Sequence, residues 1–255
     1  MKIIAITQAR TGSSRLPNKV LKTIDGESLL EIQINRIKTA KRITNIIVAT
    51  TVKVEDELIE KEAQRLGVGS YRGSEDDVLD RFYQAVKLIK PDYVVRLTSD
   101  CPLLDGHLID EVVELALSEK VDYCSNTLDE TFPDGQDIEV FTFEALEKAW
   151  LDAKLKSERE HVTPFIKNNS TFHNRELFNA TNFYSEYAEY KDVRMTVDER
   201  EDFVVISKMI EKFGKDESWN VYAKYYVENE NVGGLNSCIV RNEGYIKSIK
   251  EDLQK

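Results

Sequence analysis

The strongest constraint on the fold is an alternation of short apolar runs with stretches of helical spacing through the first half of the chain. The apolar runs are rich in β-branched residues and only six or seven residues long, which is typical of buried strands. In the helical stretches, apolar residues recur every three or four positions, as Leu30, Ile34 and Ile37 do. This pattern predicts an α/β fold with a mostly parallel sheet and helices on both faces. The expected strands are residues 2–7, 45–51 and 92–98, and the expected helices are residues 29–41, 54–66, 76–89 and 108–118.

The second half of the chain is less regular. A strand is expected at 139–143, and residues 182–197 alternate weakly enough to suggest that they include an antiparallel strand. There is no repeat, no low-complexity tract and no clear linker, so we expect one domain over residues 1–255 with an irregular part at about 215–255. Further helices are expected at 144–154, 158–167, 201–213, 221–227 and from 243 onward.

Charge is distributed unevenly along the chain. The 255 residues carry a formal net charge of -11, which argues against nucleic acid as a general partner because backbone binding needs a basic surface. The first 24 residues nevertheless contain no Asp or Glu. A local basic segment on an acidic protein suits a small polyanion. The cations of this segment are Lys2, Arg10, Arg15, Lys19 and Lys22.

Cysteine usage and hydropathy indicate the compartment. Cys101, Cys124 and Cys238 form no CxxC pair and no metal-ligand spacing, which favours reduced thiols. The N-terminus shows no signal-peptide pattern, and no apolar run approaches membrane-spanning length. We therefore expect a cytoplasmic protein with no membrane partner.

The loop at residues 8–19 follows the first strand, at the sheet edge where open α/β folds bind ligands. Gly12 allows the backbone to approach a ligand, and Ser13 and Ser14 add hydroxyl donors beside backbone N–H groups. The loop matches neither GxxxxGK[ST] nor GxGxxG, so it is not a Walker loop or a dinucleotide motif. A solvated surface loop is the alternative to an anion site. The charged groups that would bind phosphate oxygens are Arg10, Arg15 and Lys19.

Two aspartates are candidate metal ligands. Asp100 directly follows the strand at 92–98, and Asp198 ends a second β-like run. A bound triphosphate needs Mg²⁺, which usually takes one or two carboxylates together with phosphate oxygens. Either residue could instead cap a following helix.

Three further segments are candidates for substrate contacts. Residues 72–81 form a turn into a helix, where Ser74 could be the N-cap with Asp77 as its partner, or the turn could hold a nucleoside. Residues 133–139 form a polar turn that could hydrogen-bond a sugar or be an ordinary turn. A structural role is the alternative for the histidine that opens the helix near residue 159. The sugar-binding candidates are Gln136, Glu139, Arg159 and His161.

The residues that carry these motifs resemble the cytidylyltransferases that activate 3-deoxy-manno-octulosonate and acylneuraminate sugars. Residues 9–19 (ARTGSSRLPNK) are similar to the ARxGSxRLPxK motif of that family. The ordered segments RGSEDDVLDRF, LTSDCPLLD, PDGQDIEVF, REHVTPFI and TVDEREDF resemble its spore-coat polysaccharide biosynthesis branch, represented by the protein SpsF. The resemblance extends over almost the whole chain.

The resemblance implies a Rossmann-like, nucleotide-diphospho-sugar-transferase fold, a homodimer, and Mg²⁺-dependent transfer of CMP from CTP to an acidic sugar with release of pyrophosphate. It implies catalytic roles for Arg10, Lys19 and Asp100, and Mg²⁺ ligation by Asp100 and Asp198. The stretch 99–101 departs from the Gly-Asp of the octulosonate enzymes, which leaves the sugar open. The loop and the resemblance together give as nucleotide-binding candidates Ala9, Arg10, Gly12, Ser13, Arg15, Lys19, Arg72, Ser74 and Asp77.

Three alternatives remain open on sequence grounds. A glycosyltransferase on the same scaffold would use a nucleotide-sugar donor and release no pyrophosphate. A cytidylyltransferase could use a non-sugar acceptor. A non-catalytic module would bind CTP without turnover.

Overall fold

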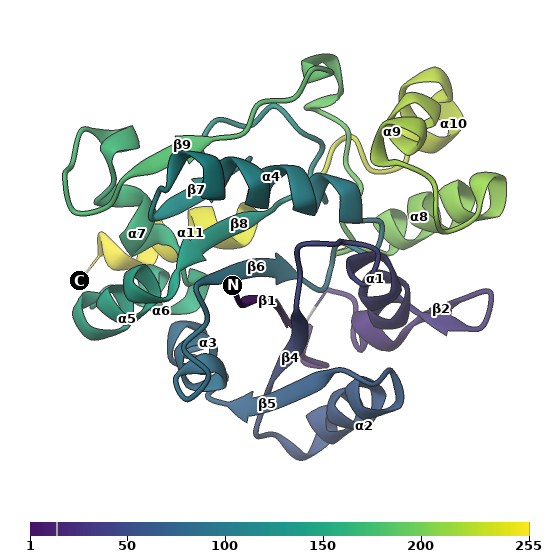
Figure 1. Cartoon of the computed structure of the whole chain (residues 1–255). Coiled ribbons are helices and arrows are strands. Elements are labelled where there is room, and N and C mark those ends of the chain that lie inside the picture. The colour runs from purple at the N-terminus through teal and green to yellow at the C-terminus, as the bar shows by residue number, and fades with distance from the viewer. Residues whose placement is uncertain (14, 255) are drawn as a thin grey trace.

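The computed structural model describes residues 1–13 and 15–254, which form a seven-stranded sheet in the order β5-β4-β1-β6-β8-β7-β9 (Figure 1). Four of the strands, from β5 to β6, run parallel, while β8 is antiparallel to both of its neighbours and β9 is parallel to β7. The α/β fold with a mostly parallel, mixed sheet is therefore as expected. The strands are β1 (Ile3–Gln8), β4 (Asn45–Thr51), β5 (Gly69–Gly73), β6 (Tyr93–Thr98), β7 (Tyr123–Ser125), β8 (Glu139–Thr142) and β9 (Ala180–Asn182), with β2 (Thr23–Ile24) and β3 (Glu27–Ser28) in a separate hairpin.

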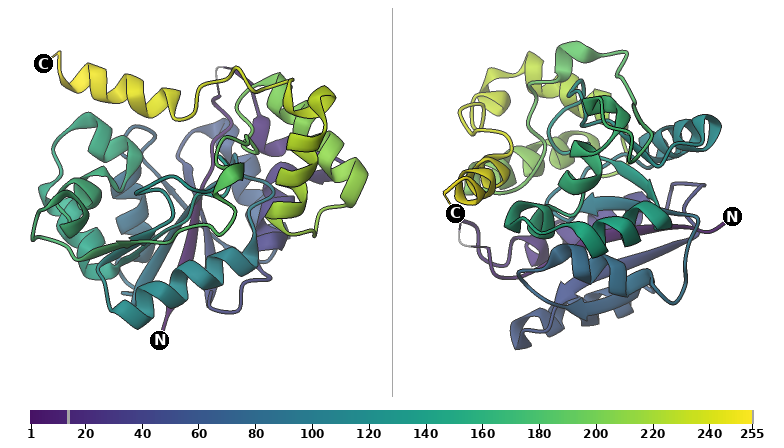
Figure 2. Two further views of the ribbon diagram at one scale, coloured as in Figure 1. Left: turned by 90° about the horizontal axis from the view of Figure 1, so that it is seen from above. Right: turned by 90° about the vertical axis from the view of Figure 1, so that its left-hand side faces the viewer.

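Helices cover both faces of the sheet (Figures 1 and 2). Successive side chains of a strand point to opposite faces of the sheet. In β1, Ile3 and Ala5 pack with α1, α4 and α8, whereas Ile4 and Ile6 pack with α3 and α5. The helices are α1 (Leu29–Ile37), α2 (Glu57–Arg65), α3 (Val78–Val86), α4 (Gly106–Glu119), α5 (Phe143–Asp152), α6 (Lys156–His161), α7 (Pro164–Asn168), α8 (Arg200–Phe213), α9 (Trp219–Glu228), α10 (Glu230–Gly233) and α11 (Glu243–Asp252).

Two expectations about the second half were wrong. The antiparallel strand lies at β8 and not within residues 182–197, which contain the short 3₁₀ helix η4 (Ala188–Tyr190) and an isolated bridge from Arg194 to Asp134. The expected helix at 158–167 is broken into α6 and α7. Val162 has a φ of 72° at the break, and Pro164 begins the second helix.

The last part of the chain crosses the sheet edge at which β1 and β6 end. Helices α9 and α10 pack beside α8, whereas α11 lies apart from them and contacts α6 (Figure 2). Within the described residues, no helix combines the length and apolar character needed to cross a membrane.

Candidate active site

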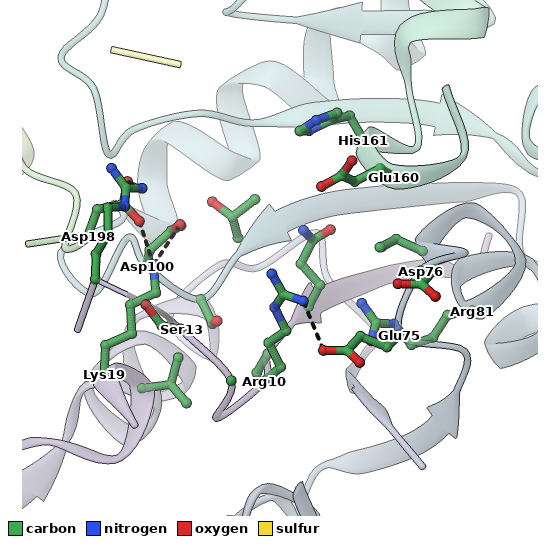
Figure 3. A pocket seen from close by; sticks show the side chains of 18 of the residues that line it. Arg10, Ser13, Lys19, Glu75, Asp76, Arg81, Asp100, Glu160, His161 and Asp198 are labelled. Atoms are coloured by element: carbon green, nitrogen blue, oxygen red, sulfur yellow. Dashed lines mark hydrogen bonds and ion pairs between the residues drawn. The ribbon is translucent and has the colours of Figure 1, made fainter. Parts of the chain in front are cut away.

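A cavity of about 380 Å³ opens where β1 and β6 end (Figure 3). One wall comes from the loop after β1, a second from the turn after β6, and others from α3, α6 and the segment before α8. Six predicted nucleotide-binding residues line it, and so do both predicted metal ligands, Asp100 and Asp198. The six are Ala9, Arg10, Gly12, Ser13, Arg15 and Lys19. Ser14, a predicted hydroxyl donor, is outside the described residues.

In the cavity, Lys19 lies between the side chains of Asp100 and Asp198. Its Nζ lies 2.7 Å from Asp198 Oδ1 and 3.3 Å from Asp100 Oδ2, and only 13% of its side chain is exposed. Burial alone would lower the pKa of Lys19, but the two carboxylates outweigh burial and raise that pKa above its ordinary value. Burial opposes ionisation of Asp100 as well, and Lys19 reverses the effect, so the pKa of Asp100 is lowered. The Lys19 ammonium and the Asp100 carboxylate are therefore charged at neutral pH.

The loop after β1 is held in place by buried hydrogen bonds. The backbone N–H and the hydroxyl of Thr11 both donate to Asp56 Oδ1 at 2.7 Å, and the hydroxyl of Thr51 donates to the same carboxylate. Asn18 adopts a left-handed conformation (φ 56°) at the start of the 3₁₀ helix η1 (Lys19–Leu21). This turn directs the Lys19 side chain from a surface loop into the cavity.

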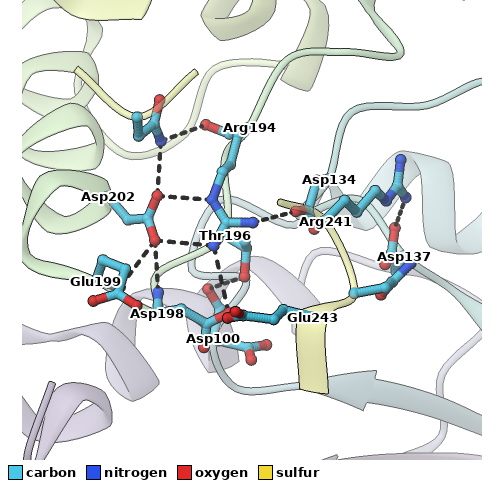
Figure 4. A network of polar contacts seen from close by, with 12 residues as sticks. Asp100, Asp134, Asp137, Arg194, Thr196, Asp198, Glu199, Asp202, Arg241 and Glu243 are labelled. Carbon is cyan, nitrogen blue, oxygen red and sulfur yellow. Dashed lines mark hydrogen bonds and ion pairs between the residues drawn. The ribbon is translucent and has the colours of Figure 1, made fainter. Parts of the chain in front are cut away.

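Asp198 is positioned by a buried network around Arg194 (Figure 4). The guanidinium of Arg194 donates to Asp134 at 2.6 Å, to Asp202 at 2.9 and 3.0 Å, and to Asp198 at 3.4 Å. Asp202 also accepts from the backbone N–H groups of Asp198 and Glu199, both at 2.9 Å. The network fixes both the side chain and the backbone of Asp198.

Neither Asp100 nor Asp198 caps the helix that follows it. The N-cap of α8 is Glu199, with Asp202 completing its capping box, and the N-cap of α4 is Asp105. Asp100 and Asp198 precede these caps and face the cavity. Their segments are joined by the Val197 N–H, which donates to the Asp100 carbonyl oxygen at 2.7 Å.

The two loop arginines are already paired with acids. Arg10 Nη1 lies 3.1 Å from Glu75 Oε1 at one side of the cavity. At the opposite side, Arg15 contacts Asp198 and Glu199 at 3.2 Å and reaches Glu243 of α11 at 3.1 Å. These pairs compensate the positive charges of the loop.

His161 connects the cavity wall to α11. Its Nε2 lies 3.1 Å from Ser248 Oγ, which also donates to Glu160 at 2.9 Å, and its ring meets Tyr245 edge-on at 5.0 Å. Burial, followed by the positive charge of Arg96, lowers the pKa of His161 to about 4, against the opposing effect of Glu160. The imidazole is therefore neutral at pH 7.

The structure places the other predicted contacts away from the cavity. Arg72 donates to the carbonyl oxygens of Thr51 and Lys53, which joins β5 to the end of β4. Asp77 is the N-cap of α3, the position expected for Ser74, whose hydroxyl accepts from the Asp77 N–H.

The expected sugar-binding side chains other than His161 do not line the cavity, and their polar groups bind partners within the fold. Arg159 donates to Asp77 and to the Trp150 carbonyl oxygen. Gln136 is fully buried and bridges the Asp105 N–H and the Leu103 carbonyl oxygen. Glu139 pairs with Arg96, and accepts from the hydroxyls of Tyr123 and Thr163.

Several cavity residues were not predicted as site residues. Glu75, Asp76 and Arg81 come from the turn and first helical turns after β5, and Lys156 and Glu160 come from α6. The available signal was the position of Arg81: it lies three residues after Val78 and next to Phe82, on the apolar face of its helix. A charge at such a position points to a specific role.

Among the described residues, no group of three or more His, Cys, Asp or Glu side chains is arranged to hold a metal ion. A metal at Asp100 and Asp198 would therefore have two protein carboxylates and would need its other ligands from substrate and water, which is the usual arrangement for Mg²⁺.

Comparison with known proteins gives one consistent family. A sequence model of the family described as cytidylyltransferase matches residues 4–232. The uncharacterized protein MJ1063 of Methanocaldococcus jannaschii is 47% identical over 84% of this chain and 85% of its own. The spore coat polysaccharide biosynthesis protein SpsF of Bacillus subtilis is 30% identical over 84% of this chain and 88% of its own.

A solved structure shares most of this architecture. A cytidylyltransferase from Leptospira borgpetersenii superimposes with a TM-score of 0.84 at 33% sequence identity, covering 91% of this chain and 96% of the other.

Proposed function

Because the chain belongs to the cytidylyltransferase family, we propose that it transfers CMP from CTP to a hydroxyl of an acidic, nonulosonate-like sugar and releases pyrophosphate. The family assignment makes it a CTP-dependent nucleotidyltransferase. The acceptor class is inferred from the name of the SpsF relative and from the resemblance to sugar-activating enzymes. That relative's name also suggests a role in surface polysaccharide synthesis.

One observation carries the proposal: Lys19 and the carboxylates of Asp100 and Asp198 converge beside the loop that carries Arg10 and Arg15. Three cations near two acids suit a polyanion that arrives with a divalent cation. A solvated surface loop would not bring a largely buried lysine between two aspartate side chains.

The residues present fit a Mg²⁺ ion. The Lys19 ammonium lies within hydrogen-bond distance of an oxygen of each aspartate, so the pair already favours positive charge. Asp100 and Asp198 would hold the ion. When bound, Mg²⁺ would neutralise charge on the phosphate oxygens.

The chain's own residues position the nucleotide for in-line displacement. The acceptor hydroxyl oxygen attacks the α-phosphorus of CTP and loses its proton to water, and the bond from that phosphorus to the oxygen it shares with the β-phosphate breaks. Lys19 and Arg10 stabilise the negative charge that develops on the departing pyrophosphate. Arg15 can join them if it exchanges its carboxylate partners for phosphate oxygens.

We also propose that the enzyme is a cytoplasmic homodimer.

A nucleotide-by-acceptor screen for pyrophosphate release tests the proposal. With Mg²⁺ present, we expect release only with CTP together with an acidic sugar, and none in EDTA. Release with a non-sugar acceptor would correct the acceptor class. Consumption of a nucleotide-sugar without pyrophosphate would identify a glycosyltransferase instead, and CTP binding without turnover on any acceptor would indicate a binding module.

A further inference from the structure

Arg81 has an environment unlike those of the other buried arginines. It lies on the inner face of α3 and is 3% exposed, yet its Nε and Nη1 have no hydrogen-bond partner. No carboxylate of the described residues lies within ion-pair distance of it. By contrast, all three guanidinium nitrogens of Arg194 and of Arg36 donate to acidic or carbonyl oxygens.

Burying such a group is energetically unfavourable. Burial, together with the positive charge of Arg10, lowers the pKa of Arg81 to about 10, which the carboxylates of Asp56 and Glu75 only partly offset. The guanidinium is still charged at neutral pH, so the fold buries a charge without direct partners. Buried donors that lack protein partners are expected where a ligand supplies the acceptors.

Arg81 lies at the end of the cavity away from the metal-binding acids. Figure 3 shows it beside Glu75 and Asp76, with Arg10 between it and the group of Lys19, Asp100 and Asp198. A nucleotide whose triphosphate lies along Lys19 and Arg10 would extend its base toward Arg81.

Resting on the proposed function, we propose that Arg81 is the residue that selects the base, donating its guanidinium hydrogens to the O2 and N3 acceptors of cytosine. These two atoms are adjacent acceptors and match a planar donor group. In uracil, N3 carries a hydrogen and is a donor, so one contact becomes donor against donor. A site built around specific hydrogen bonds rejects an analogue that lacks them by large factors.

The position of Gln8 adds to this argument. Gln8 is the last residue of β1, lines the same cavity, and has a buried side-chain oxygen without a hydrogen-bond partner. A carbonyl oxygen there can accept from the exocyclic amino group of cytosine, which uracil replaces with an acceptor. Together, Arg81 and Gln8 offer a donor group and an acceptor group that complement the edge of cytosine.

Calorimetric titration of the full chain with CTP and UTP, in Mg²⁺, tests the assignment without requiring an acceptor. We expect wild type to prefer CTP by about a hundredfold or more, and Arg81→Met to reduce that preference at least tenfold, mainly by weakening CTP. Arg81→Lys keeps the charge without the planar donor group and should lose selectivity as well. Arg42→Met, which removes an exposed arginine paired with Glu114, is the matched control and should leave both affinities unchanged.

The melting temperature separates recognition from a structural role. Because Arg81 has no direct protein partner through Nε or Nη1, Arg81→Met should melt at or above the wild-type temperature. An equal loss of CTP and UTP affinity would overturn the proposal in favour of a phosphate contact. A lower melting temperature with unchanged selectivity would show that Arg81 is structural. If Arg81→Met does not fold, retained selectivity in Arg81→Lys overturns the proposal.

The same titration distinguishes this inference from the proposed function. A wild-type protein that binds neither nucleotide would refute the nucleotide site and Arg81 together. A wild-type protein that prefers CTP while Arg81→Met keeps the same preference would refute only the role of Arg81.

Discussion

At the scale of single residues, the cations of the site are paired with carboxylates of the protein itself. Lys19 is shared by Asp100 and Asp198, and Arg15 is shared by Asp198, the neighbouring Glu199, and Glu243 of α11. A triphosphate must compete with these carboxylates for the cations. A divalent cation at the aspartates would compensate them as the lysine moves to phosphate, so metal and nucleotide should bind cooperatively.

Asp100→Asn should retain the fold and lose activity. Lys19 keeps Asp198 at 2.7 Å, so the buried ammonium is not left alone, but the site loses one of its two candidate metal carboxylates. We expect Mg²⁺-dependent pyrophosphate release to fall by roughly a hundredfold or more, as for other losses of a charge-stabilising group. Glu211→Gln, which changes an exposed acid of α8, is the control. Unchanged turnover in Asp100→Asn would remove this residue from the mechanism.

Arg194→Leu should destabilise the fold strongly. Arg194 is 6% exposed on its side chain and compensates Asp202, whose side chain has no exposed surface. Removing one member of a buried ion-pair network costs about 3–5 kcal/mol, because the other charges remain buried. Urea unfolding measures this loss. Lys148→Gln breaks an exposed pair with Asp152 and should change stability by less than about 1 kcal/mol. A comparable effect of the two substitutions would contradict the network's role.

The residues of the site were predictable to different degrees. The loop cations and Asp100 could be placed, because parallel strands bring their carboxyl ends to one edge. Asp198 reaches the same edge from a segment that forms no strand. Gln136, Glu139 and Arg159 could not be separated from ligand contacts, because their buried partners come from segments distant in sequence. Such partners are determined by tertiary packing and leave no local pattern.

At the scale of elements, helix ends give a test that does not depend on function. Lys120 ends α4 with a φ of 54°, a left-handed conformation in which a side chain is strained and glycine is not. Lys120 is exposed, so Lys120→Gly should stabilise the protein by about 0.5–1 kcal/mol in urea unfolding.

Lys87 provides the matched control for this substitution. It is the exposed C-cap of α3 but has a right-handed helical conformation, with a φ of -56°. Lys87→Gly should therefore destabilise by about 0.5–1 kcal/mol, because glycine gains no conformational relief there and loses more entropy on folding. Effects of the same sign at the two positions would contradict the backbone argument.

Elements with strong periodicity were predicted well, and short ones were not. The strands β1, β4 and β6 and the helices that follow them have clear apolar patterns. β5 (Gly69–Gly73) and β7 (Tyr123–Ser125) were missed, because the first has no fully buried residue and the second has only three residues. Their strand conformation comes from pairing with β4 and β8, which sequence periodicity does not report.

At the scale of the whole molecule, folding stability should depend on pH through several buried groups at once. Asp100, Glu139 and Asp202 have lowered pKa values, so their contribution is present above about pH 4 and is lost below it. Asp134 acts in the opposite direction: burial raises its pKa to about 7, so its contribution is lost as pH rises from about 4 to 7. The pH profile of the wild-type protein is the sum of such terms.

His161 can be isolated from that sum by comparing wild type with His161→Gln. The folded pKa of His161, about 4, is below its ordinary value near 6.5. The neutral form is favoured in the fold, so its contribution is complete above about pH 6.5 and is lost as pH falls toward 4. Glutamine cannot titrate and can still hydrogen-bond to Ser248. From pH 7.5 to pH 4.5, wild type should therefore lose roughly 1–3 kcal/mol more unfolding free energy than the variant. The acidic residues are common to both proteins and largely cancel in the difference, so parallel pH profiles would show that His161 does not titrate as the geometry requires.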